Sequence, residues 1–393
     1  MNIQGSLQKE PWIKMKKVIV FGNDHTNSVG VIQSLGKAGY ESVGLLFGAK
    51  TDLVISSIYT SYIITAQDPQ ACVDKLLETC FDSDVKIPII ATCDMAALTL
   101  ERNADRLKGL FVFEYSKQYT LEYLSKKENQ VRLAAEAGFN VPKSWNLKDS
   151  KVIPDEVCFP CIIKPLVSCE GAKTDIRVCK TKEDLVYNLN NLGHTKNVLL
   201  QQYIERDYEI SILGCALTSG KCIIPAVENK LTLYPKYVGL ECLANIQPLE
   251  DTSIRYSIEN LIAHIGYVGL FSVEMMHCIT DGKFYFTEIN LRNDGAEAFI
   301  TKYGANLPLN HIEDLNGLAL TEQVVFQPGY YIWEMHHLAS VACGDISLLT
   351  WIKEIYKSNG FLMSHIGDMK PFFFQFLNPI LQKLKIKKRE FYK

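Results

Sequence analysis

The sequence predicts an α/β domain built on a parallel sheet, followed by an α+β region with antiparallel strands. Between residues 17 and 106, short apolar strands alternate with amphipathic helices, and this alternation is typical of a parallel sheet with crossover helices. Between residues 197 and 290, strand patterns follow one another with few helices, which favours an α+β arrangement. The length of 393 residues also suggests two or three domains.

The first part of the chain alternates regularly. We expect strands at 17–23, 42–47, 62–64 and 87–91, and helices at 27–39, 68–80 and 95–106. His25 and Asp94 follow the carboxyl ends of two strands, the edge at which open α/β sheets bind ligands, although turn residues without chemistry explain them equally well. The turn from Gly22 to Gly30 lacks the G-x-G-x-x-G pattern, so a dinucleotide site has little support.

A lysine and a polar loop stand out in the middle of the chain. After a helix at 126–137, the buried strand 158–165 carries Lys164 near its end, where an ammonium among apolar residues needs an anionic partner. The following loop, 166–174, has a hydroxyl, one glycine and a second lysine, so its backbone N–H groups can cradle phosphate. Further strands are expected at 175–179, 197–204, 205–213, 223–226 and 242–246, with helices at 181–192 and 254–266.

The strand that begins at Phe284 carries polar residues where a core strand would carry apolar ones. Side chains two residues apart leave a strand on the same face, so we expect Glu288 and Asn290 to point with Phe284 and Phe286 towards a core. A carboxylate in that position is costly unless a cation neutralises it. Mg2+ fits a carboxylate, an amide oxygen and water, whereas an ordinary hairpin would place these polar residues at its solvated rim.

The preceding strand, 269–279, offers Glu274 as a third ligand. A three-residue loop, Thr280 to Gly282, with Gly282 in the left-handed conformation, would set Glu274 opposite Glu288. A two-residue Asp-Gly turn would instead set Glu274 opposite Ile289. Two facing carboxylates repel unless a cation or a proton lies between them, so the metal hypothesis predicts the three-residue loop.

The last part of the chain combines helices with a basic, aromatic tail. We expect helices at 309–317, 334–343 and 347–358. The run Phe372 to Leu377 precedes a cluster of basic residues, namely Lys383, Lys385, Lys387, Lys388, Arg389 and Lys393. Aromatic residues beside a basic run can lie on an anionic membrane surface, and a helix packed on the body with a solvated basic end is the alternative.

The composition argues against several classes of partner and of targeting segment. Lys and Arg total 41 and Asp and Glu 44, a net charge of −3, which argues against nucleic acid as the main partner. The twelve cysteines are scattered, and Cys158 and Cys161 form a lone C-x-x-C, so we expect reduced thiols. The first 14 residues carry charges rather than a signal peptide and suggest a disordered extension. No apolar run is long enough to span a membrane, and we expect a cytoplasmic protein.

The strand-end lysine, the phosphate-type loop, the short crossing between strands and the Glu…Glu-x-Asn hairpin occur in that order. Together they resemble the ATP-grasp superfamily from residue 17 to 320. The segments Phe286 to Gly295 and Gly304 to Pro308 look most like the D-aspartate ligase group and its carbamoyl-phosphate-synthase-like neighbours. The resemblance implies a parallel pre-ATP-grasp domain and a two-part ATP-grasp fold. Its expected units are 15–120, 121–204, 205–330 and a helical region with a basic tail at 331–393.

The resemblance also assigns roles to residues. Those implied in nucleotide binding are Lys127, Lys164, Ser168, Gly171, Lys173, Gln202, Tyr203, Ile204 and Glu209. Glu274, Glu288 and Asn290 would bind one or two Mg2+, or Mn2+, and Arg292 would face the phosphoryl intermediate, with Lys164 as its catalytic companion. The chain departs from the family pattern in two places, since its lid loop keeps only Gly171 and Gln201 stands where a glutamate is usual.

These roles imply an ATP-dependent carboxylate–amine ligase that forms an amide through an acyl phosphate and releases ADP and phosphate. Its partners would be a small carboxylate, such as an amino acid, and an amine acceptor, with a homodimer as the expected assembly and peripheral membrane contact through the tail. The alternatives are carbamoyl-phosphate-synthase-like chemistry on carbamate or bicarbonate, and a catalytically silent ATP-binding sensor or scaffold. The depleted lid loop favours the silent protein, whereas the complete set of metal ligands and lysines favours the ligase.

Overall fold

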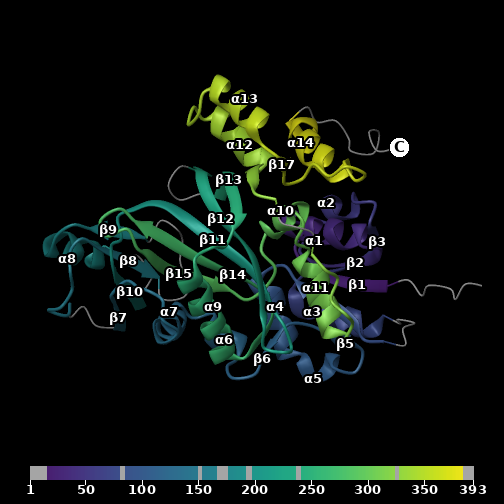
Figure 1. Ribbon diagram of the computed structural model, residues 1–393, viewed down its shortest axis with the longest axis horizontal. Coiled ribbons are helices and arrows are strands. Elements are labelled where there is room, and N and C mark those ends of the chain that lie inside the picture. Colours follow the sequence, from purple (N-terminus) through teal and green to yellow (C-terminus); the bar gives the residue numbers. More distant parts are fainter. Residues whose placement is uncertain are drawn as a thin grey trace, which may run out of the picture.

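The computed structural model describes residues 16–79, 85–148, 153–165, 176–191, 197–235, 240–323 and 327–383. The expected disordered extension, residues 1–14, and the lid residues Ser168, Gly171 and Lys173 lie outside the described residues. Three sheets organise the rest of the chain, and Figure 1 shows them from one side to the other.

The first sheet is parallel, as the sequence predicts. Its strand order is β3-β2-β1-β4-β5, and all of its pairings are parallel. Its strands are β1 (Lys16–Gly22), β2 (Tyr40–Phe47), β3 (Thr60–Ala66), β4 (Ile87–Ala91) and β5 (Phe111–Val112). Its helices are α1 (Thr26–Lys37), α2 (Asp52–Ile55), α3 (Pro69–Glu78), α4 (Asp94–Arg102) and α5 (Ala104–Leu107). The helix expected at 95–106 is therefore divided in two at Asn103.

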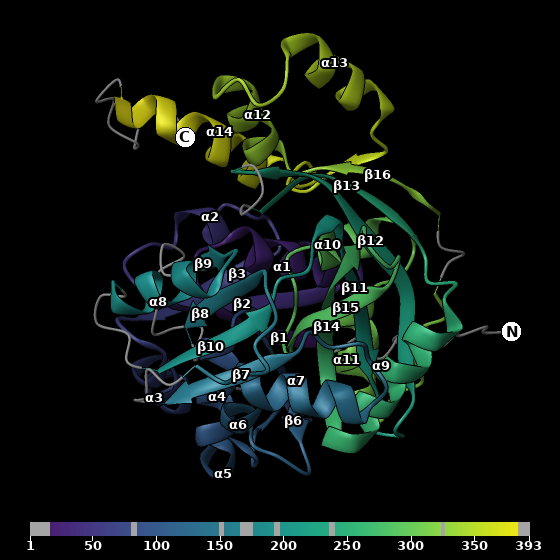
Figure 2. The ribbon, with the colours of Figure 1, turned by 90° about the vertical axis from the view of Figure 1, so that its left-hand side faces the viewer.

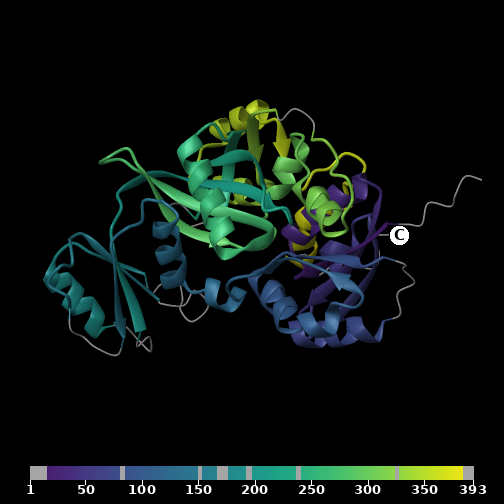
Figure 3. The ribbon, with the colours of Figure 1, turned by 60° about the horizontal axis from the view of Figure 1, so that its bottom comes forward.

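A small antiparallel unit follows and stands apart from the rest of the molecule (Figure 3). Its sheet has the order β7-β10-β8-β9 and carries one helix. Its elements are β7 (Ser144–Lys148), β8 (Cys161–Pro165), β9 (Arg177–Cys179), α8 (Lys182–Asn190) and β10 (Asn197–Gln202). The helices α6 (Leu121–Leu124) and α7 (Lys127–Glu136) lead into it from the first domain. Leu147, Ile163, Leu185 and Leu200 are among the residues of its own apolar core.

The large sheet occupies the centre, with the order β15-β14-β11-β12-β13-β16-β17, and its pairings are antiparallel except that of β16 with β17. Its strands are β11 (Arg206–Ala216), β12 (Cys222–Tyr234), β13 (Leu240–Pro248), β14 (Tyr267–Cys278), β15 (Phe284–Asn290), β16 (Gly329–Ile332) and β17 (Gly360–Phe361). A short strand, β6 (Tyr115–Ser116), pairs with the start of β14. The associated helices are α9 (Thr252–Ile265), α10 (Glu297–Lys302) and α11 (Leu307–Leu315). The pattern at 223–226 thus predicted only a part of β12.

The last helices gather at one end of the molecule (Figure 2). They are α12 (Glu334–Ala342), α13 (Leu348–Lys357) and α14 (Lys370–Lys383). Asp368 fastens this region to the first domain, because its carboxylate accepts hydrogen bonds from Gln33 Nε2, Ser57 Oγ and Ile58 N. Among the helices that the structure describes, none combines the length and apolar character needed to cross a bilayer.

The hairpin of β14 and β15 confirms the predicted pairing of Glu274 with Glu288, but the predicted loop is wrong. Cys278 N donates to Lys283 O, and Gly282 N donates to Cys278 O, so the loop has four residues rather than three. Gly282 adopts the left-handed conformation, with φ of 68°. Close to the loop the strands pair His277 with Phe284 and Met275 with Phe286. Unless an irregularity follows, this register would move Glu288 away from Glu274.

A β-bulge at Thr287 corrects the register. Met275 pairs with Phe286 and Glu274 with Glu288, so Thr287 is an extra residue on β15. Because neighbouring residues of β14 point to opposite faces, Phe286 and Glu288 also point to opposite faces. The expectation that Glu288 shares a face with Phe286 is therefore wrong, and the bulge is its physical cause. Phe286 is buried in the core, whereas Glu288 is partly exposed.

Gln130 on α7 secures the outer edge of β15 at this point. Its Oε1 accepts from Ile289 N at 3.2 Å, and its Nε2 donates to Ile289 O at 3.0 Å and to Leu124 O at 2.9 Å. The side chain thus replaces the missing neighbour strand of an edge residue. Because buried backbone groups without partners are costly, this contact holds the bulged strand in place.

We predict that Gln130→Leu destabilises the protein by about 1–3 kcal/mol, because it leaves the buried polar groups of Ile289 without partners. Urea unfolding would measure the change in the free energy of unfolding. Ala135→Gln, at an exposed position on the same helix, serves as the control and should change stability by less than about 0.5 kcal/mol. Equal stabilities for Gln130→Leu and the control would contradict the role given to Gln130.

Candidate active site

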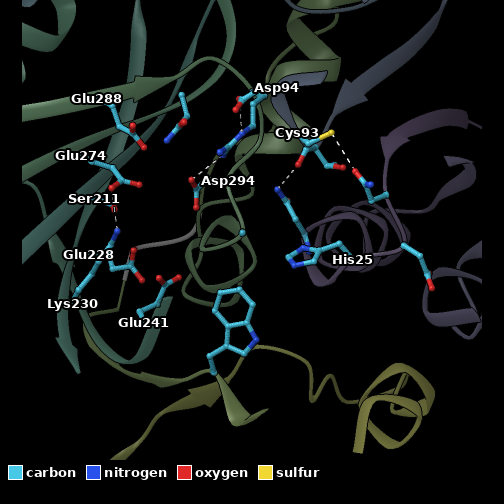
Figure 4. A pocket seen from close by; sticks show the side chains of 18 residues that line it. His25, Cys93, Asp94, Ser211, Glu228, Lys230, Glu241, Glu274, Glu288 and Asp294 are labelled. Carbon is cyan, nitrogen blue, oxygen red and sulfur yellow. Dashed lines mark hydrogen bonds and ion pairs between the residues drawn. The ribbon is translucent and has the colours of Figure 1, made fainter. Parts of the chain in front are cut away.

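A cavity of about 560 Å³ lies between the first domain and the large sheet. Figure 4 shows the side chains that line it. The first domain contributes Asn23, Asp24, His25, Asn27, Thr92, Cys93 and Asp94. The large sheet and the segment after β15 contribute Ser211, Glu228, Lys230, Glu241, Glu274, Glu288, Asn290, Arg292, Asp294 and Gly295, and Trp333 completes the lining.

The wall from the first domain is formed by the residues that follow the carboxyl ends of β1 and β4. For His25 and Asp94 at these ends, the sequence left open either ligand contacts or turns without chemistry. His25 caps α1, with Nδ1 accepting from Asn27 N at 3.3 Å. Burial lowers the pKa of His25, an effect that the neighbouring Asp24 charge opposes. Asp94 accepts from Arg292 Nε at 3.3 Å. The structure therefore brings His25 and Asp94 into the same cavity as the hairpin.

The hairpin places its two facing carboxylates on the cavity wall, each with one lysine. Lys127 Nζ lies 3.5 Å from Glu288 Oε2, and Lys230 Nζ lies 3.5 Å from Glu274 Oε2. Burial raises the pKa of Glu274 to about 7, and although Lys230 opposes this shift, the facing Glu288 adds to it. The pair therefore carries more negative charge than its buried surroundings readily hold.

The residues present fit Mg2+. Glu274, Glu288 and Asn290 offer hard oxygen atoms on adjacent strands, and Asn290 pairs with Ser272 on β14, one pleat beyond the carboxylates. Within the described residues, no group of three or more His, Cys, Asp or Glu side chains could hold a metal ion without other help. Two carboxylates and an amide nevertheless suit Mg2+, which usually keeps several waters and takes further ligands from substrate phosphates.

Arg292 lies on the cavity wall between the hairpin and the first domain. Its Nη1 donates to Asp294 Oδ2 at 3.0 Å and to Asn293 O at 3.1 Å, and its Nε donates to Asp94. Asp294 is itself held by Ser272 Oγ, at 2.9 Å. The guanidinium is thus fixed by three acceptors, with part of its surface turned to the cavity.

The residues proposed for nucleotide binding gather around Lys164. Its Nζ donates to Gln201 Oε1 at 2.8 Å. Burial and the positive charge of Lys127 lower the pKa of Lys164 to about 8, although Glu288 opposes both effects. Glu209, which is paired with Arg206, also acts on this ammonium. Lys127, Lys164 and Glu209 therefore lie within electrostatic range of one another.

The strand proposed to hold adenine joins the two antiparallel sheets. Gln202 N donates to Lys143 O at 2.8 Å, and Tyr203 N donates to Pro160 O at 3.1 Å. Ile204 is buried next to them. Gln202, Tyr203 and Ile204 thus form the chain's passage from β10 to β11, close to Glu209.

Sequence reasoning missed several residues of the cavity. No role was assigned from the sequence to six of them, namely Ser211, Glu228, Lys230, Glu241, Asp294 and Trp333. One signal was present, because Glu228 and Lys230 are charged residues two apart on an otherwise half-buried strand and so share a face. Their meeting with Glu274 depends on strand pairing over long separations, which the pattern does not reveal.

We predict that the free protein loses stability as the pH rises from about 5 to about 7.5, because Glu274 keeps its proton in the folded state to a higher pH than in the unfolded state. The folded pKa of about 7 exceeds the unfolded value of 4.5. The unfolded chain therefore loses this proton first, and stability declines through that window. The titration of Glu274 can lower the free energy of unfolding by at most about 3 kcal/mol over this range.

Denaturant titrations without Mg2+ at several pH values would measure this decline. Glu274→Gln should flatten it relative to the unaltered protein, and Mg2+ should reduce it in the unaltered protein only. Identical pH profiles for both proteins would rule out the proposed titration of Glu274.

Comparisons with known proteins agree with this arrangement. Residues 132–298 match the ATP-grasp domain. A formate-dependent phosphoribosylglycinamide formyltransferase from Bacillus velezensis is 26% identical over 218 residues, which cover 52% of this chain and 54% of that protein. A D-aspartate ligase from Enterococcus faecium is 22% identical over 253 residues, which cover 59% of each protein. The chain thus spans little more than half the length of these two relatives.

A solved structure shares the fold over most of the chain. The ADP complex of N5-carboxyaminoimidazole ribonucleotide synthetase aligns with a TM-score of 0.63 at 16% identity and covers 84% of this chain and 85% of that one. The parallel first sheet and the antiparallel sheets of this chain correspond to those expected from the sequence. The domain match and the shared fold agree, and residues 132–298 of this chain match the ATP-grasp domain.

Proposed function

We propose that the protein is an ATP-dependent carboxylate–amine ligase that forms an amide bond through an acyl phosphate. One observation carries the proposal. The facing carboxylates Glu274 and Glu288, with Asn290 beside them, line one cavity together with Arg292 and Lys230, and Lys127 Nζ lies 3.5 Å from Glu288 Oε2. A transferring phosphoryl group requires this combination of oxygen ligands for Mg2+ and fixed positive charge.

The chemistry follows from the substrates. A carboxylate oxygen attacks the γ-phosphorus of ATP, and ADP leaves. The acyl phosphate then accepts an amine at its carbonyl carbon, and inorganic phosphate leaves as the amine loses a proton. No side-chain nucleophile is needed, so the protein positions reactants and stabilises charge. Glu274, Glu288 and Asn290 would hold Mg2+, which would supply positive charge to neutralise the phosphates.

The chain's own residues divide this work. Lys127 and Lys164 would meet the ATP phosphates, and Gln202 to Ile204 with Glu209 would hold the nucleoside. Arg292 would stabilise the charge of the acyl phosphate, because three acceptors fix its guanidinium at the cavity wall. The lid residues Ser168, Gly171 and Lys173 would cover the phosphates.

The relatives' names support a carboxylate substrate. One is formate-dependent and another is a D-aspartate ligase, and both formate and D-aspartate are carboxylates. We infer a small carboxylate, with an amino acid as the leading candidate. Bicarbonate chemistry would give ADP without an amide product, and a silent ATP-binding protein would give neither.

We predict that purified protein with ATP and Mg2+ releases ADP and forms an amide with one pair from a matrix of carboxylates and amines. Glu288→Gln should lower this rate at least about 100-fold, because it removes a metal-binding oxygen and its charge. Coupled ADP release and mass spectrometry of the product would measure both. Glu250→Gln, at an exposed position after β13, is the matched control and should keep the full rate.

An unchanged rate for Glu288→Gln would falsify the assignment. ADP release without amide across the whole matrix would favour bicarbonate or carbamate chemistry. Tight ATP binding without any ADP release would favour a sensor or scaffold.

We also infer that α13 contacts an anionic membrane. Leu348, Leu349, Ile352 and Tyr356 are 58%, 72%, 51% and 91% exposed, and their spacing places them within an arc of about 100° on the helix. Lys353 and Lys357 are exposed on the same helix. The basic sequence of residues 383–393 follows α14 directly. An apolar helix face with basic flanks is typical of helices that lie at a membrane surface.

We predict that the protein sediments with vesicles that contain phosphatidylserine and binds pure phosphatidylcholine vesicles less. The double substitution Leu349→Asp with Ile352→Asp should weaken this binding at least about 10-fold, since each apolar side chain contributes about 1.5–3 kcal/mol when buried. A loss of self-association in place of vesicle binding would assign the face to a second copy of the chain.

A further inference from the structure

The register of the large sheet places a row of residues across four strands. Glu288 pairs with Glu274, Glu274 pairs with Ser211, and Ser211 pairs with Glu228. Residues directly opposite one another point to the same face, and all four line the cavity. Figure 4 shows Glu288, Glu274, Ser211 and Glu228 following one another along one wall. Neighbouring strands lie about 4.8 Å apart, so Glu228 lies about 10 Å from Glu274 along the row.

Glu228 is a buried carboxyl with one oxygen atom, Oε1, that has no hydrogen-bond partner among the described residues. The residue is only 1% exposed. The ion pairs of the cavity do not include Glu228. Lys230 pairs with Glu274, at 3.5 Å, and Arg292 pairs with Asp294 and Asp94. A buried polar atom without a partner is costly, so its retention on the cavity wall points to a ligand.

Glu241 adds a second buried carboxyl at the same end of the cavity. It lies on β13, next to the strand of Glu228, and is 8% exposed. Burial raises the pKa of both carboxyls, the charge of Glu241 raises that of Glu228 further, and the charge of Lys230, which pairs with Glu274, opposes both shifts. Two such groups hold their negative charge only when a cation neutralises them.

Trp333 lines the cavity at the end where Glu228 and Glu241 lie, and its indole N–H has no acceptor among the described residues. Its backbone N–H donates to Cys242 O at 2.9 Å, which fixes the residue beside Glu241. The residue is 5% exposed. An indole N–H free to donate, together with an aromatic ring, suits a ligand with a hydrogen-bond acceptor close to its cationic group.

We propose that Glu228, Glu241 and Trp333 form the subsite for the amine substrate and bind it as a protonated primary amine with a neighbouring acceptor, as in an amino acid. The inference rests on the proposed function, since it identifies which reactant occupies the cavity end remote from Glu288. The two carboxylates bind the ammonium, and the indole N–H donates to the adjacent oxygen. A neutral or anionic acceptor, such as an alcohol or bicarbonate, would leave both carboxylates unpaired and is rejected for that reason.

The first experiment measures binding without turnover. Ligand-observed NMR would compare glycinamide, a primary ammonium beside an amide oxygen, with its hydroxyl counterpart glycolamide, in the absence of ATP. The unaltered protein should bind the amine at least about 10-fold more tightly, because only the ammonium neutralises the pair. The double variant Glu228→Gln with Glu241→Gln should lose that preference. Equal binding of both probes by the unaltered protein, or an unchanged preference in the double variant, would overturn the proposal.

The second experiment measures turnover with the substrate pair found by ADP release. Glu228→Gln should raise the KM for the amine about 10–100-fold and leave the KM for ATP unchanged. Trp333→Phe keeps an aromatic ring, removes only the N–H, and should raise the amine KM by a smaller factor. Glu259→Gln, at an exposed position on α9, is the matched control with no effect. An equal rise of the KM for ATP in Glu228→Gln would show a merely structural role.

The two experiments separate the two hypotheses. If no carboxylate and amine pair supports ADP release, the ligase proposal fails, while the glycinamide preference still tests the subsite. If amide forms but Glu228→Gln and Glu241→Gln leave the amine KM unchanged, the subsite fails and the ligase proposal stands.

Discussion

The extra residue at Thr287 is the constraint on which the rest of the site depends. On one side of it, Phe286 packs against Phe139, with ring centroids 5.3 Å apart, and belongs to the large core. On the other side, Glu288 and Asn290 face the cavity. A regular strand would have given all three side chains one face, and the carboxylate would have entered the core at a cost of several kcal/mol. The bulge allows one short strand to serve both the core and the chemistry, and its place at the sheet edge makes the irregularity tolerable.

The row of residues across the large sheet, from Glu288 through Glu274 to Glu228, concentrates negative charge that the fold alone does not neutralise. Facing carboxylates on adjacent strands destabilise a sheet, and here Lys127 and Lys230 offset them from two different parts of the chain. In the proposed reaction, bound Mg2+ would take over this role, and both ammonium groups would become available to phosphate. The charges that stabilise the free protein are thus the charges that the proposed function uses, which explains why the lysines and carboxylates lie together without forming tight pairs.

Much of this fold could be predicted from the sequence, because hydrophobic periodicity reports local structure directly. The alternating strands and helices up to Arg102 and the helices α7, α9, α12 and α13 lie where the patterns place them. The pairing of Glu274 with Glu288 was predicted correctly for the wrong reason, since a four-residue loop and a bulge compensate each other. The strands β16 and β17 were missed because they are short and pair only with distant segments. The Ser211–Glu228 pairing was out of reach for the same reason, and no sequence signal near Trp333 reveals its position beside Cys242.

The domain match covers only some of the residues that line the cavity. Residues 132–298 supply Glu274, Glu288, Asn290 and Arg292, but two walls of the cavity come from outside this segment. Asn27 joins the wall from the first domain to the matched segment, because its Nδ2 donates both to Thr92 O at 2.9 Å and to Asn293 O at 3.0 Å. Asn293 N in turn donates to Ala91 O at 3.0 Å. His25 and Asp94 are thus held against the hairpin of β14 and β15 by contacts between segments far apart in sequence. In the proposed function, the residues from 132–298 would serve phosphoryl transfer, whereas these flanking walls would contact the substrates.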